Sequence, residues 1–267
     1  MRIGFIGGGN MGGAIIGGIV SSGIYKAEDI TVFDIFKENA EKLVSEYKVK
    51  KGENNKKTAE MSDILFLAVK PNVIGDVINE IKDFIKDECV IVSIAAGKSI
   101  DEISSLFGRK IKLVRVMPNT PALVGEGMAA LCGNENISDD EVGKIADIFN
   151  CLGKAEIVPE KMMDIVTAVS GSSPAFVYMF IEAMADAAVL GGMPRVQAYK
   201  FAAQTVMGSA KMVLDTGRHP GELKDMVCSP AGTTIEAVAE LERLGMRTAV
   251  IEAVRVCEAK SKAMSKR

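Results

Sequence analysis

The sequence predicts an α/β protein in which an N-terminal, doubly wound and mainly parallel sheet is followed by an all-helical C-terminal region. Short apolar runs alternate with amphipathic segments as far as about residue 158, and this strand–helix alternation is typical of doubly wound sheets. The runs at 64–69 and 90–94 are almost uniformly apolar, as strands buried on both faces require. From Lys161 onward the chain has no β-rich run. We therefore expect two domains, 1–158 and 159–267.

Each N-terminal element has its own local signal. Strands are expected at 3–6, 30–33, 64–69, 90–94 and 113–116. Helices are expected from Asn10 to about Ser22 and at 38–47, and Pro71 suits the first turn of the next helix. Two pairs have the spacing of a capping box and predict two further helix starts, Ser99 with Glu102 and Ser138 with Glu141.

The C-terminal region consists of Ala-, Met- and Val-rich segments with helical periodicity. Breaks are expected at Gly171, Gly191–Gly192, Gly217, Pro220, Pro230–Gly232 and Gly245. The run 176–181 is apolar without interruption, and a helix that is apolar all round must be buried. Because a domain of roughly 100 residues cannot hide that much apolar surface alone, we expect a homodimer through this region. Glu182 and Asp186 share one face of the stretch 174–190, which favours a core or interface helix over a membrane span.

Composition excludes several classes of function. The net charge of −3 and the 5% aromatic content, with no Trp, give no basis for binding nucleic acid or an anionic membrane. Five scattered cysteines without a CxxC pair, and a single histidine, His219, make a zinc site unexpected and indicate free thiols in a reducing compartment. No signal peptide is recognisable, so we expect a cytoplasmic protein.

A glycine-rich turn follows the first predicted strand. Gly7, Gly9 and Gly12 fit G-x-G-x-x-G, in which the first glycine allows a tight turn, the second lets a pyrophosphate approach the backbone, and the third lets the helix pack closely on the strand. The free amides of the helix start then face the phosphates. A turn that serves packing alone is the alternative, but the strand–turn–helix context favours a Rossmann-type dinucleotide site.

Asp34 closes the second predicted strand, where a ribose-binding acid is expected. A carboxylate there accepts hydrogen bonds from ribose hydroxyls and repels a 2′-phosphate, which favours NADH over NADPH. Lys37 lies nearby and can reach a phosphate. A solvated Asp at a strand end is the alternative.

A second turn of small and hydroxylated residues, 229–234, precedes the helical stretch 235–244. Amides of Gly232, Thr233 and Thr234 can hold a carboxylate, and the hydroxyls of Ser229, Thr233 and Thr234 can contact a substrate. Taken by itself, the stretch favours the simpler interpretation of a Ser/Thr N-cap. The similar turn 170–174 is expected to start the most buried helix, either as a cap or as a wall under the substrate.

No general acid or base stands out in the sequence. A hydroxyacid dehydrogenase needs a His or Lys to move the alcohol proton, and His219 lies next to Pro220 in a polar turn that is expected at the surface. A C=N substrate needs less help, since an imine protonates far more readily than a ketone. The sequence therefore favours an imine reductase. A β-hydroxyacid or prephenate-type dehydrogenase and a non-catalytic dinucleotide-sensing dimer remain the alternatives.

Several motifs together resemble the pyrroline-5-carboxylate reductase family over the whole chain. They are 5–12, Ala68–Pro71, Ala95–Gly97, Met117–Pro121, Ser170–Ala175 and 219–234. The resemblance implies an NADPH- or NADH-dependent oxidoreductase that reduces 1-pyrroline-5-carboxylate to L-proline, the last step of proline biosynthesis. It also implies a helical domain that interlocks into a dimer, often assembled into a decamer.

The resemblance also implies roles for individual residues. The residues Ile6, Gly7, Gly8, Gly9, Asn10, Met11 and Gly12 would hold the pyrophosphate, and further cofactor contacts would come from Asn55, Ala68, Val69, Lys70, Pro71, Ala95 and Ala96. Ser229, Gly232 and Thr233 would bind the substrate carboxylate, and Thr234 would donate a hydrogen bond to the ring nitrogen as the catalytic residue. With the resemblance, the turn 229–234 is interpreted as a substrate site rather than as a cap alone.

Two departures from the family pattern stand out. Asp34 replaces the small polar or basic residues that are usual there, which sets its preference for NADH against the family's NADPH. Ala231 and Thr233 stand where some members have Gly and Ala, and both are small enough to keep the backbone approach.

Overall fold

The computed structural model describes residues 1–264. These divide into two compact units. Unit 1 contains Met1–Ser172 together with the chain from Cys257 onward, and unit 2 contains Ser173–Val256. The division into functional domains at residue 158 stays a prediction.

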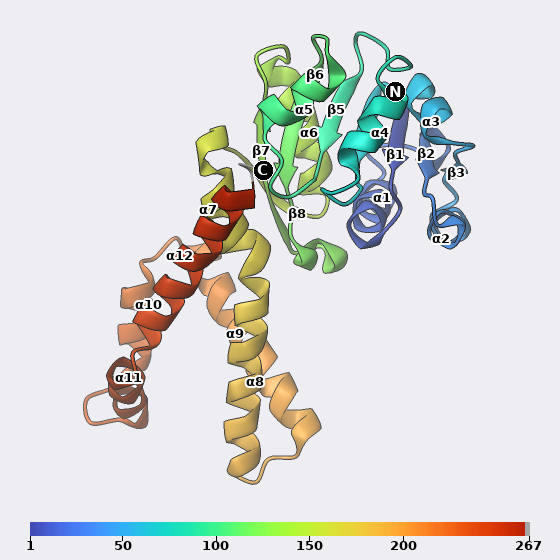
Figure 1. Ribbon diagram of the computed structural model, residues 1–267. Coiled ribbons are helices and arrows are strands. Elements are labelled where there is room, and N and C mark those ends of the chain that lie inside the picture. Colours follow the sequence, from blue (N-terminus) through green and yellow to red (C-terminus); the bar gives the residue numbers. More distant parts are fainter. Residues whose placement is uncertain (265–267) are drawn as a thin grey trace. The chain divides into compact units, whose positions relative to one another are not determined.

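Unit 1 is built on one sheet of eight strands in the order β3-β2-β1-β4-β5-β6-β7-β8. The strands are β1 (Ile3–Ile6), β2 (Ile30–Phe33), β3 (Lys50–Lys51), β4 (Ile64–Leu67), β5 (Val90–Ser93), β6 (Lys112–Met117), β7 (Gly127–Gly133) and β8 (Gly153–Ile157). All neighbours pair in parallel except β6 and β7. The strand order reverses between β1 and β4, which is the topological switch point of a doubly wound sheet. The predicted fold class is confirmed (Figure 1).

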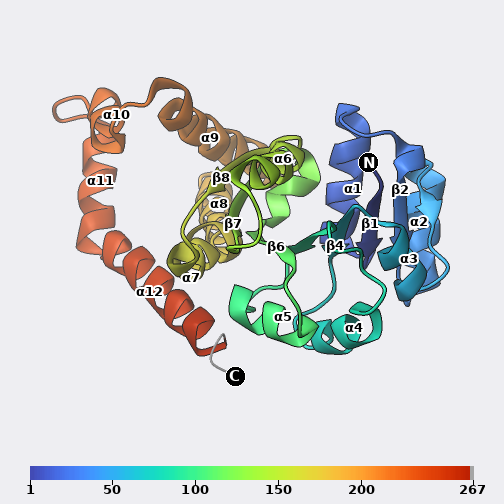
Figure 2. The ribbon, with the colours of Figure 1, turned by 90° about the horizontal axis from the view of Figure 1, so that it is seen from above.

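Helices cover both faces of this sheet. The helices are α1 (Asn10–Ser22), α2 (Lys37–Tyr47), α3 (Asn55–Met61), α4 (Ile74–Ile81), α5 (Ile100–Phe107) and α6 (Asp139–Asn150), with short 3₁₀ turns at Ala27–Asp29, Thr120–Val124 and Glu160–Met162. One core lies between the sheet and α1, α2 and α6, and the other between the sheet and α3, α4 and α5. Figure 2 shows α1 on one side of the central strands and α4 and α5 on the other. Phe5 and Phe66 stack at 4.5 Å in the first core.

Local signals placed most of these elements correctly. Both capping boxes are formed, with Ser99 and Ser138 as the N-caps. The prediction for Pro71 is wrong, because α4 begins only at Ile74 and Pro71 lies in the preceding turn. The strands expected at 64–69 and 90–94 end earlier, at Leu67 and Ser93. Four elements carried no recognised signal, namely α3, β3, β7 and β8.

From residue 160 to 264 every element is helical, as predicted. The elements after the 3₁₀ turn are α7 (Met163–Val166), a π-helical turn (Thr167–Ser172), α8 (Pro174–Leu190), α9 (Arg195–Thr216), α10 (Pro220–Val227), α11 (Thr233–Arg243) and α12 (Met246–Met264). The expected break at Gly171 is wrong, because the π turn continues through it. A Cβ on Gly171 would lie 2.4 Å from Cε of Met117, so this glycine serves close packing.

Unit 2 has a small core and a large apolar surface. Helices α8 and α9 pack side by side (Figure 1) around Ala185, Ala198 and Ala202. The run expected to be buried is exposed in the single chain, with Tyr178 at 58% and Met179 at 68% exposure. Of the two expected places for this helix, a core or an interface between subunits, the core of the single chain does not hold this run, and the interface interpretation stands. By length and composition, Glu160–Leu190 is also the one candidate for a membrane span among the described residues.

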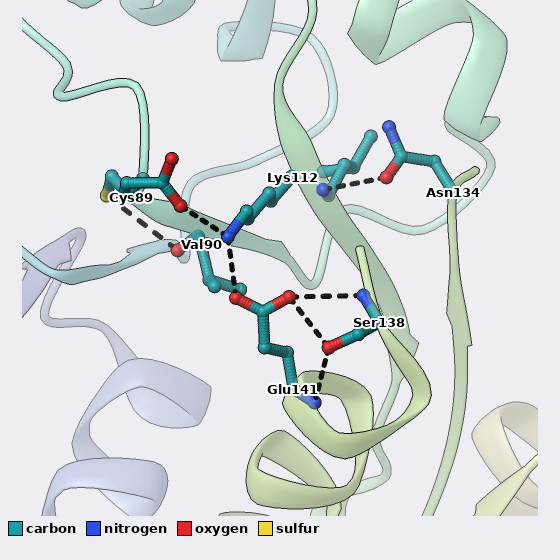
Figure 3. Close-up of polar contacts among 8 residues, drawn as sticks. Cys89, Val90, Lys112, Asn134, Ser138 and Glu141 are labelled. Carbon is teal, nitrogen blue, oxygen red and sulfur yellow. Dashed lines mark hydrogen bonds and ion pairs between the residues drawn. The ribbon is translucent and has the colours of Figure 1, made fainter. Parts of the chain in front are cut away.

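Ion pairs connect neighbouring elements at the amino edge of the sheet. The Lys112 ammonium lies 2.6 Å from Oε2 of Glu88 and 2.8 Å from Oε1 of Glu141. Figure 3 shows Glu141 reaching Lys112 with one oxygen and the Ser138 cap with the other. These contacts hold the pKa of Glu141 down to about 2, with the Lys112 hydrogen bond as the largest cause. One side chain thus links β6, the loop before β5, and the start of α6.

Candidate active site

The predicted cofactor residues gather at the carboxyl edge of the sheet. The five parallel strands from β3 to β5 all end at this edge. The glycine turn follows β1 at the switch point, Asp34 follows β2, and Asn55 follows β3. Ala68–Pro71 and Ala95–Ala96 follow β4 and β5. Open α/β sheets bind their ligands at this edge and at this switch point.

The three glycines of the turn each meet the requirement that predicted them. Gly7 has φ +105°, and a Cβ there would lie 2.4 Å from the carbonyl oxygen of Ala68. Gly12 packs so closely that a Cβ would lie 2.4 Å from the Gly7 oxygen. Gly9 is different, because a Cβ there would have no atom within 4 Å. The open space lies where a pyrophosphate must approach the backbone, so the turn fits a dinucleotide.

The start of α1 offers unused amides beside that open space. Gly9 is the N-cap and has no side chain to cap the helix. Asn10, Met11 and Gly12 form the first turn, whose N–H groups have no partner inside a helix. These amides and the positive end of the helix dipole favour an anion.

Asp34 is tied to the glycine turn, a link that the sequence did not indicate. Its Oδ2 accepts hydrogen bonds from the Gly8 amide at 2.7 Å and from Nδ2 of Asn39 at 3.2 Å. Its Oδ1 accepts one from the Phe36 amide at 2.8 Å. A carboxylate has about four acceptor positions, so one on Oδ1 is left for a ribose hydroxyl. The carboxylate is therefore fixed in place and still able to accept.

The remaining predicted cofactor residues differ in which of their hydrogen-bonding groups are already used within the protein. The Asn55 amide nitrogen donates to Oε2 of Glu80 at 2.7 Å, which leaves its oxygen and its second N–H available. The Ala68 amide donates to the Ile6 oxygen at 2.9 Å and so fixes the start of the Ala68–Pro71 loop. A cavity of about 530 Å³ touches Gly8 and Gly9 but runs along the flank of α1 towards α2, so it is not the groove at the carboxyl edge.

The substrate turn lies in unit 2 at the start of α11. The helix begins at Thr233, two residues earlier than predicted, and its N-cap is Gly232. No side chain caps it, so the alternative of a Ser/Thr N-cap is wrong. The first-turn amides of Thr233, Thr234 and Ile235 have no partner inside the helix. The Gly232 amide is already used, since it donates to the Ser229 oxygen at 3.1 Å.

The backbone of this turn is tight. A Cβ on Gly232 would lie 2.3 Å from Oγ of Ser229, so a side chain there would displace the Ser229 hydroxyl. Ala231 adopts φ +55°, a conformation that costs an L-residue roughly 1–2 kcal/mol. Among residues 1–264, the hydroxyls of Ser229, Thr233 and Thr234 make no hydrogen bond to the protein. The turn can therefore present hydroxyls and amides to a small carboxylate.

Two further polar residues have roles that the sequence did not reveal. The buried Asn119 side chain donates to the Ser170 oxygen at 3.0 Å and accepts from the Met128 amide at 2.9 Å, which joins the Met117–Pro121 segment to the π turn. His219 is the exposed N-cap of α10, and its Nδ1 accepts from the Gly221 amide at 3.0 Å. Neither residue is placed as a general acid.

Comparison with known proteins matches both halves of the chain. A family model described as pyrroline-5-carboxylate reductase dimerisation matches residues 160–264, and one described as NADP oxidoreductase, coenzyme F420-dependent, matches residues 2–97. The pyrroline-5-carboxylate reductase of Escherichia coli K12 is 51% identical over 265 residues, covering 99% of this chain and 98% of the relative.

Solved structures give the same result. The crystal structure of Plasmodium falciparum pyrroline carboxylate reductase with NADP bound matches with a TM-score of 0.90 and 36% identity, covering 99% of this chain and 98% of that one. A prephenate dehydrogenase from A. aeolicus matches with a TM-score of 0.54 at 15% identity over 100% of this chain and 99% of its own. The second likeness concerns the fold alone.

Proposed function

Because the chain belongs to the pyrroline-5-carboxylate reductase family, we propose that it reduces 1-pyrroline-5-carboxylate to L-proline, the last step of proline biosynthesis. A reduced nicotinamide dinucleotide supplies the hydride when bound, and the C=N bond of the substrate receives it. The observation that carries the proposal is the 51% identity to the E. coli enzyme over almost the full length of both chains.

We assign the two halves of the reaction to the two predicted domains. Residues 1–158 hold the dinucleotide, with the glycine turn and first-turn amides of α1 at the pyrophosphate and the loops after β2, β4 and β5 along its two nucleoside halves. Residues 159–267 hold the substrate and form the dimer. The match of residues 160–264 to a dimerisation domain supports this division.

The turn at the start of α11 binds the substrate carboxylate. The amides of Thr233 and Thr234, with the Ser229 and Thr233 hydroxyls, supply donors without any arginine. Gly232 contributes by having no side chain, because a Cβ would meet Ser229. The Thr234 hydroxyl donates a hydrogen bond to the ring nitrogen, which gains electron density as hydride reaches the neighbouring carbon. Thr234 is thus the catalytic residue.

A dehydrogenase for β-hydroxyacids or prephenate is not favoured. Such an enzyme needs a His or Lys to take the alcohol proton, and the ring nitrogen of His219 that faces the backbone is already an acceptor within its own helix cap. The likeness to prephenate dehydrogenase stays at 15% identity. A dinucleotide-sensing dimer without activity would not need a turn built for a carboxylate.

NADH is the coenzyme that Asp34 favours. Its carboxylate is held by three donors at the end of β2 and keeps one acceptor position for a ribose hydroxyl. A 2′-phosphate at the same place would meet a fixed negative charge. The P. falciparum relative was solved with NADP bound, whereas we propose NADH as the preferred coenzyme of this chain.

The working form is a homodimer, assembled further into a decamer, in the cytoplasm. Helix α8 exposes Val177, Tyr178, Met179 and Phe180 in the single chain, and a second copy is the partner that covers this apolar face. The charged residue Asp186 of α8 pairs with Arg195 of α9, which suits a protein interface better than lipid. We expect no partner among nucleic acids or membranes.

One side-by-side assay separates these functions. The purified protein is given 1-pyrroline-5-carboxylate, prephenate or 3-hydroxybutyrate, each with the matching reduced or oxidised form of both coenzymes, and absorbance is followed at the reduced nicotinamide band. Consumption of reduced coenzyme with the pyrroline substrate alone is the expected result. Turnover of a hydroxyacid, or binding of NADH without turnover of any substrate, would reject the assignment.

A further inference from the structure

The last turns of α12 belong to the unit that carries the cofactor residues. Helix α12 begins at Met246, but from Cys257 onward its residues cluster with unit 1. Within that unit they contact α7 and the loop that follows β5. This loop carries the predicted cofactor positions Ala95 and Ala96.

The first contact anchors the helix end. Oγ of Ser261, which is only 5% exposed, donates to Oδ1 of Asp164 at 2.6 Å. A hydrogen bond to a carboxylate is stronger than one between neutral groups. Asp164 lies on α7 next to the fully buried Met163, so the anchor is part of the rigid core.

The segment just before α7 is held as firmly. Oε1 of Glu160 accepts from Nη1 of the buried Arg115 at 2.9 Å and from the Ile100 amide at 2.7 Å. These contacts join α7 to β6 and to the start of α5, the helix that follows the Ala95–Gly97 loop. The Ser261–Asp164 hydrogen bond and the end of the Ala95–Gly97 loop that leads into α5 are therefore attached to the same part of the unit 1 core.

The second contact covers the loop. Met264 lies three residues after Ser261, on the same face of the helix. A Cβ on Gly97 would lie 3.3 Å from Cβ of Met264 and 3.4 Å from its Cε. Gly97 has φ +71°, a conformation that glycine adopts freely but does not hold by itself. The methionine therefore restricts a backbone that is otherwise free to move.

We propose that Ser261 and Met264 are positioning residues that hold the Ala95–Gly97 loop in the shape that receives the nicotinamide ring of the dinucleotide. This inference rests on the proposed function, because it takes Ala95 and Ala96 as cofactor positions. The strands β4 and β5 lie on the opposite side of the switch point from β2, whose end meets the adenosine ribose, so the loop after β5 belongs to the nicotinamide half.

Ser261 and Met264 should affect cofactor affinity by setting the fraction of molecules in which the Ala95–Gly97 loop has the conformation that binds the nicotinamide. Without Met264 the loop populates other conformations, and the apparent dissociation constant rises as the competent fraction falls. NADH loses affinity, whereas ADP-ribose, which ends at the second ribose and lacks the nicotinamide ring that the loop receives, should bind as before. A helix end that only stabilises the fold would affect both ligands alike or neither.

The test measures two dissociation constants for each of several variants of the full-length protein. NADH binding is followed by the fluorescence of the reduced nicotinamide, which the absence of Trp leaves free of indole signal, and ADP-ribose binding by calorimetry. The variants are Ser261→Ala, Met264→Ala and Asp164→Ala. Asp164→Asn keeps an oxygen that accepts from Ser261. Met61→Ala is the matched control, since Met61 and Met264 are both 42% exposed.

Met264→Ala, Ser261→Ala and Asp164→Ala should weaken NADH binding three- to tenfold and leave ADP-ribose unchanged, while Asp164→Asn and Met61→Ala match the wild type. Equal weakening of both ligands, or no weakening of NADH, would overturn the inference. Melting temperatures identify a variant that does not fold. If one of the three alanine variants fails in this way, the other two still test the inference. A wild-type protein that binds neither ligand would instead reject the proposed function.

Discussion

The carboxylate of Asp34 accepts a hydrogen bond from the amide of Gly8 at 2.7 Å. The end of β2 and the glycine turn after β1 are therefore one connected structure. This contact gives Asp34 two roles that can be separated by mutation. It holds the turn through an acceptor oxygen, and it sets the coenzyme preference through its charge.

Asp34→Asn is expected to change coenzyme choice while the turn stays intact. The amide oxygen of Asn still accepts from Gly8, but the negative charge that repels a 2′-phosphate is gone. The ratio of kcat/KM for NADPH to that for NADH should rise at least tenfold, which corresponds to about 1.4 kcal/mol. Asp34→Ser, which loses the contact as well, should also raise KM for both coenzymes. An unchanged ratio in Asp34→Asn would mean that Asp34 does not read the ribose.

Gly9→Ala is expected to impair cofactor binding, and Gly12→Ala is expected to impair stability. A Cβ on Gly9 enters open space, so the protein should melt normally but bind NADH at least tenfold more weakly, because the methyl group stands where the pyrophosphate must lie. A Cβ on Gly12 would be 2.4 Å from the Gly7 oxygen and should lower the free energy of unfolding by about 1–3 kcal/mol. Thermal melts and NADH titrations of both variants test this, and normal NADH affinity in folded Gly9→Ala would contradict it.

Thr234→Ala is expected to lower kcat and leave NADH affinity unchanged. The hydroxyl is the proposed donor to the ring nitrogen, and loss of one such donor reduces turnover by about 10²–10³-fold where it acts in the transition state. Thr234→Ser keeps a hydroxyl and should recover much of the loss. Steady-state kinetics and NADH titration measure the two effects. Wild-type kcat in Thr234→Ala would remove the donor role.

Ala231→Gly is expected to stabilise the protein. Ala231 has φ +55°, which costs an L-residue roughly 1–2 kcal/mol. Glycine removes this strain, but its greater loss of backbone entropy on folding offsets roughly half of the gain. The net gain should be about 0.5–1 kcal/mol, seen as a higher melting temperature with substrate KM unchanged. Ala237→Gly, inside α11, is the control and should destabilise. A lower melting temperature for Ala231→Gly would show that the turn is not strained at this residue.

Acid should lower the free energy of unfolding by protonating Glu141. Its pKa is lowered from 4.5 to about 2, so its contribution to stability is complete above pH 4.5 and is lost as the pH falls towards 2. The side chain is 24% exposed, and solvent screening leaves about 1–2 kcal/mol of effect. Lys112→Met removes the main cause, so its stability should change less between pH 6 and pH 3 than that of the wild type. Denaturant melts at both values measure this, and an equal change in both proteins would contradict it.

Periodicity and local chemistry were enough to predict five of the eight strands. The apolar runs marked β1, β2, β4, β5 and β6, and the capping boxes marked α5 and α6. The strand β7 was missed because Gly127–Gly133 reads GMAALCG, a composition without β-branched residues whose pairing with β6 is decided in three dimensions. The two-residue β3 is too short to have a pattern.

Contacts between distant residues could not be predicted in the same way. Asp34 was predicted as a ribose-binding residue from its spacing to the glycines, but its hydrogen bond to Gly8 depends on a side-chain rotamer that the sequence does not reveal. Ser261 and Asp164 are 97 residues apart, and no local pattern connects them. The exposed face of α8 has a different cause, since one chain is not the whole assembly. Its apolar run required burial, and the single chain does not supply the partner.

The most direct test of the central claim follows the hydride itself. Purified protein is mixed with 1-pyrroline-5-carboxylate and NADH that carries deuterium on both C4 positions, and the product is analysed by mass spectrometry and NMR. We predict L-proline with a single deuterium on Cδ, formed in equal amount to the NADH oxidised, and a slower reaction with NADPH. Unlabelled proline, or no oxidation of either coenzyme, would contradict the assignment as an imine reductase.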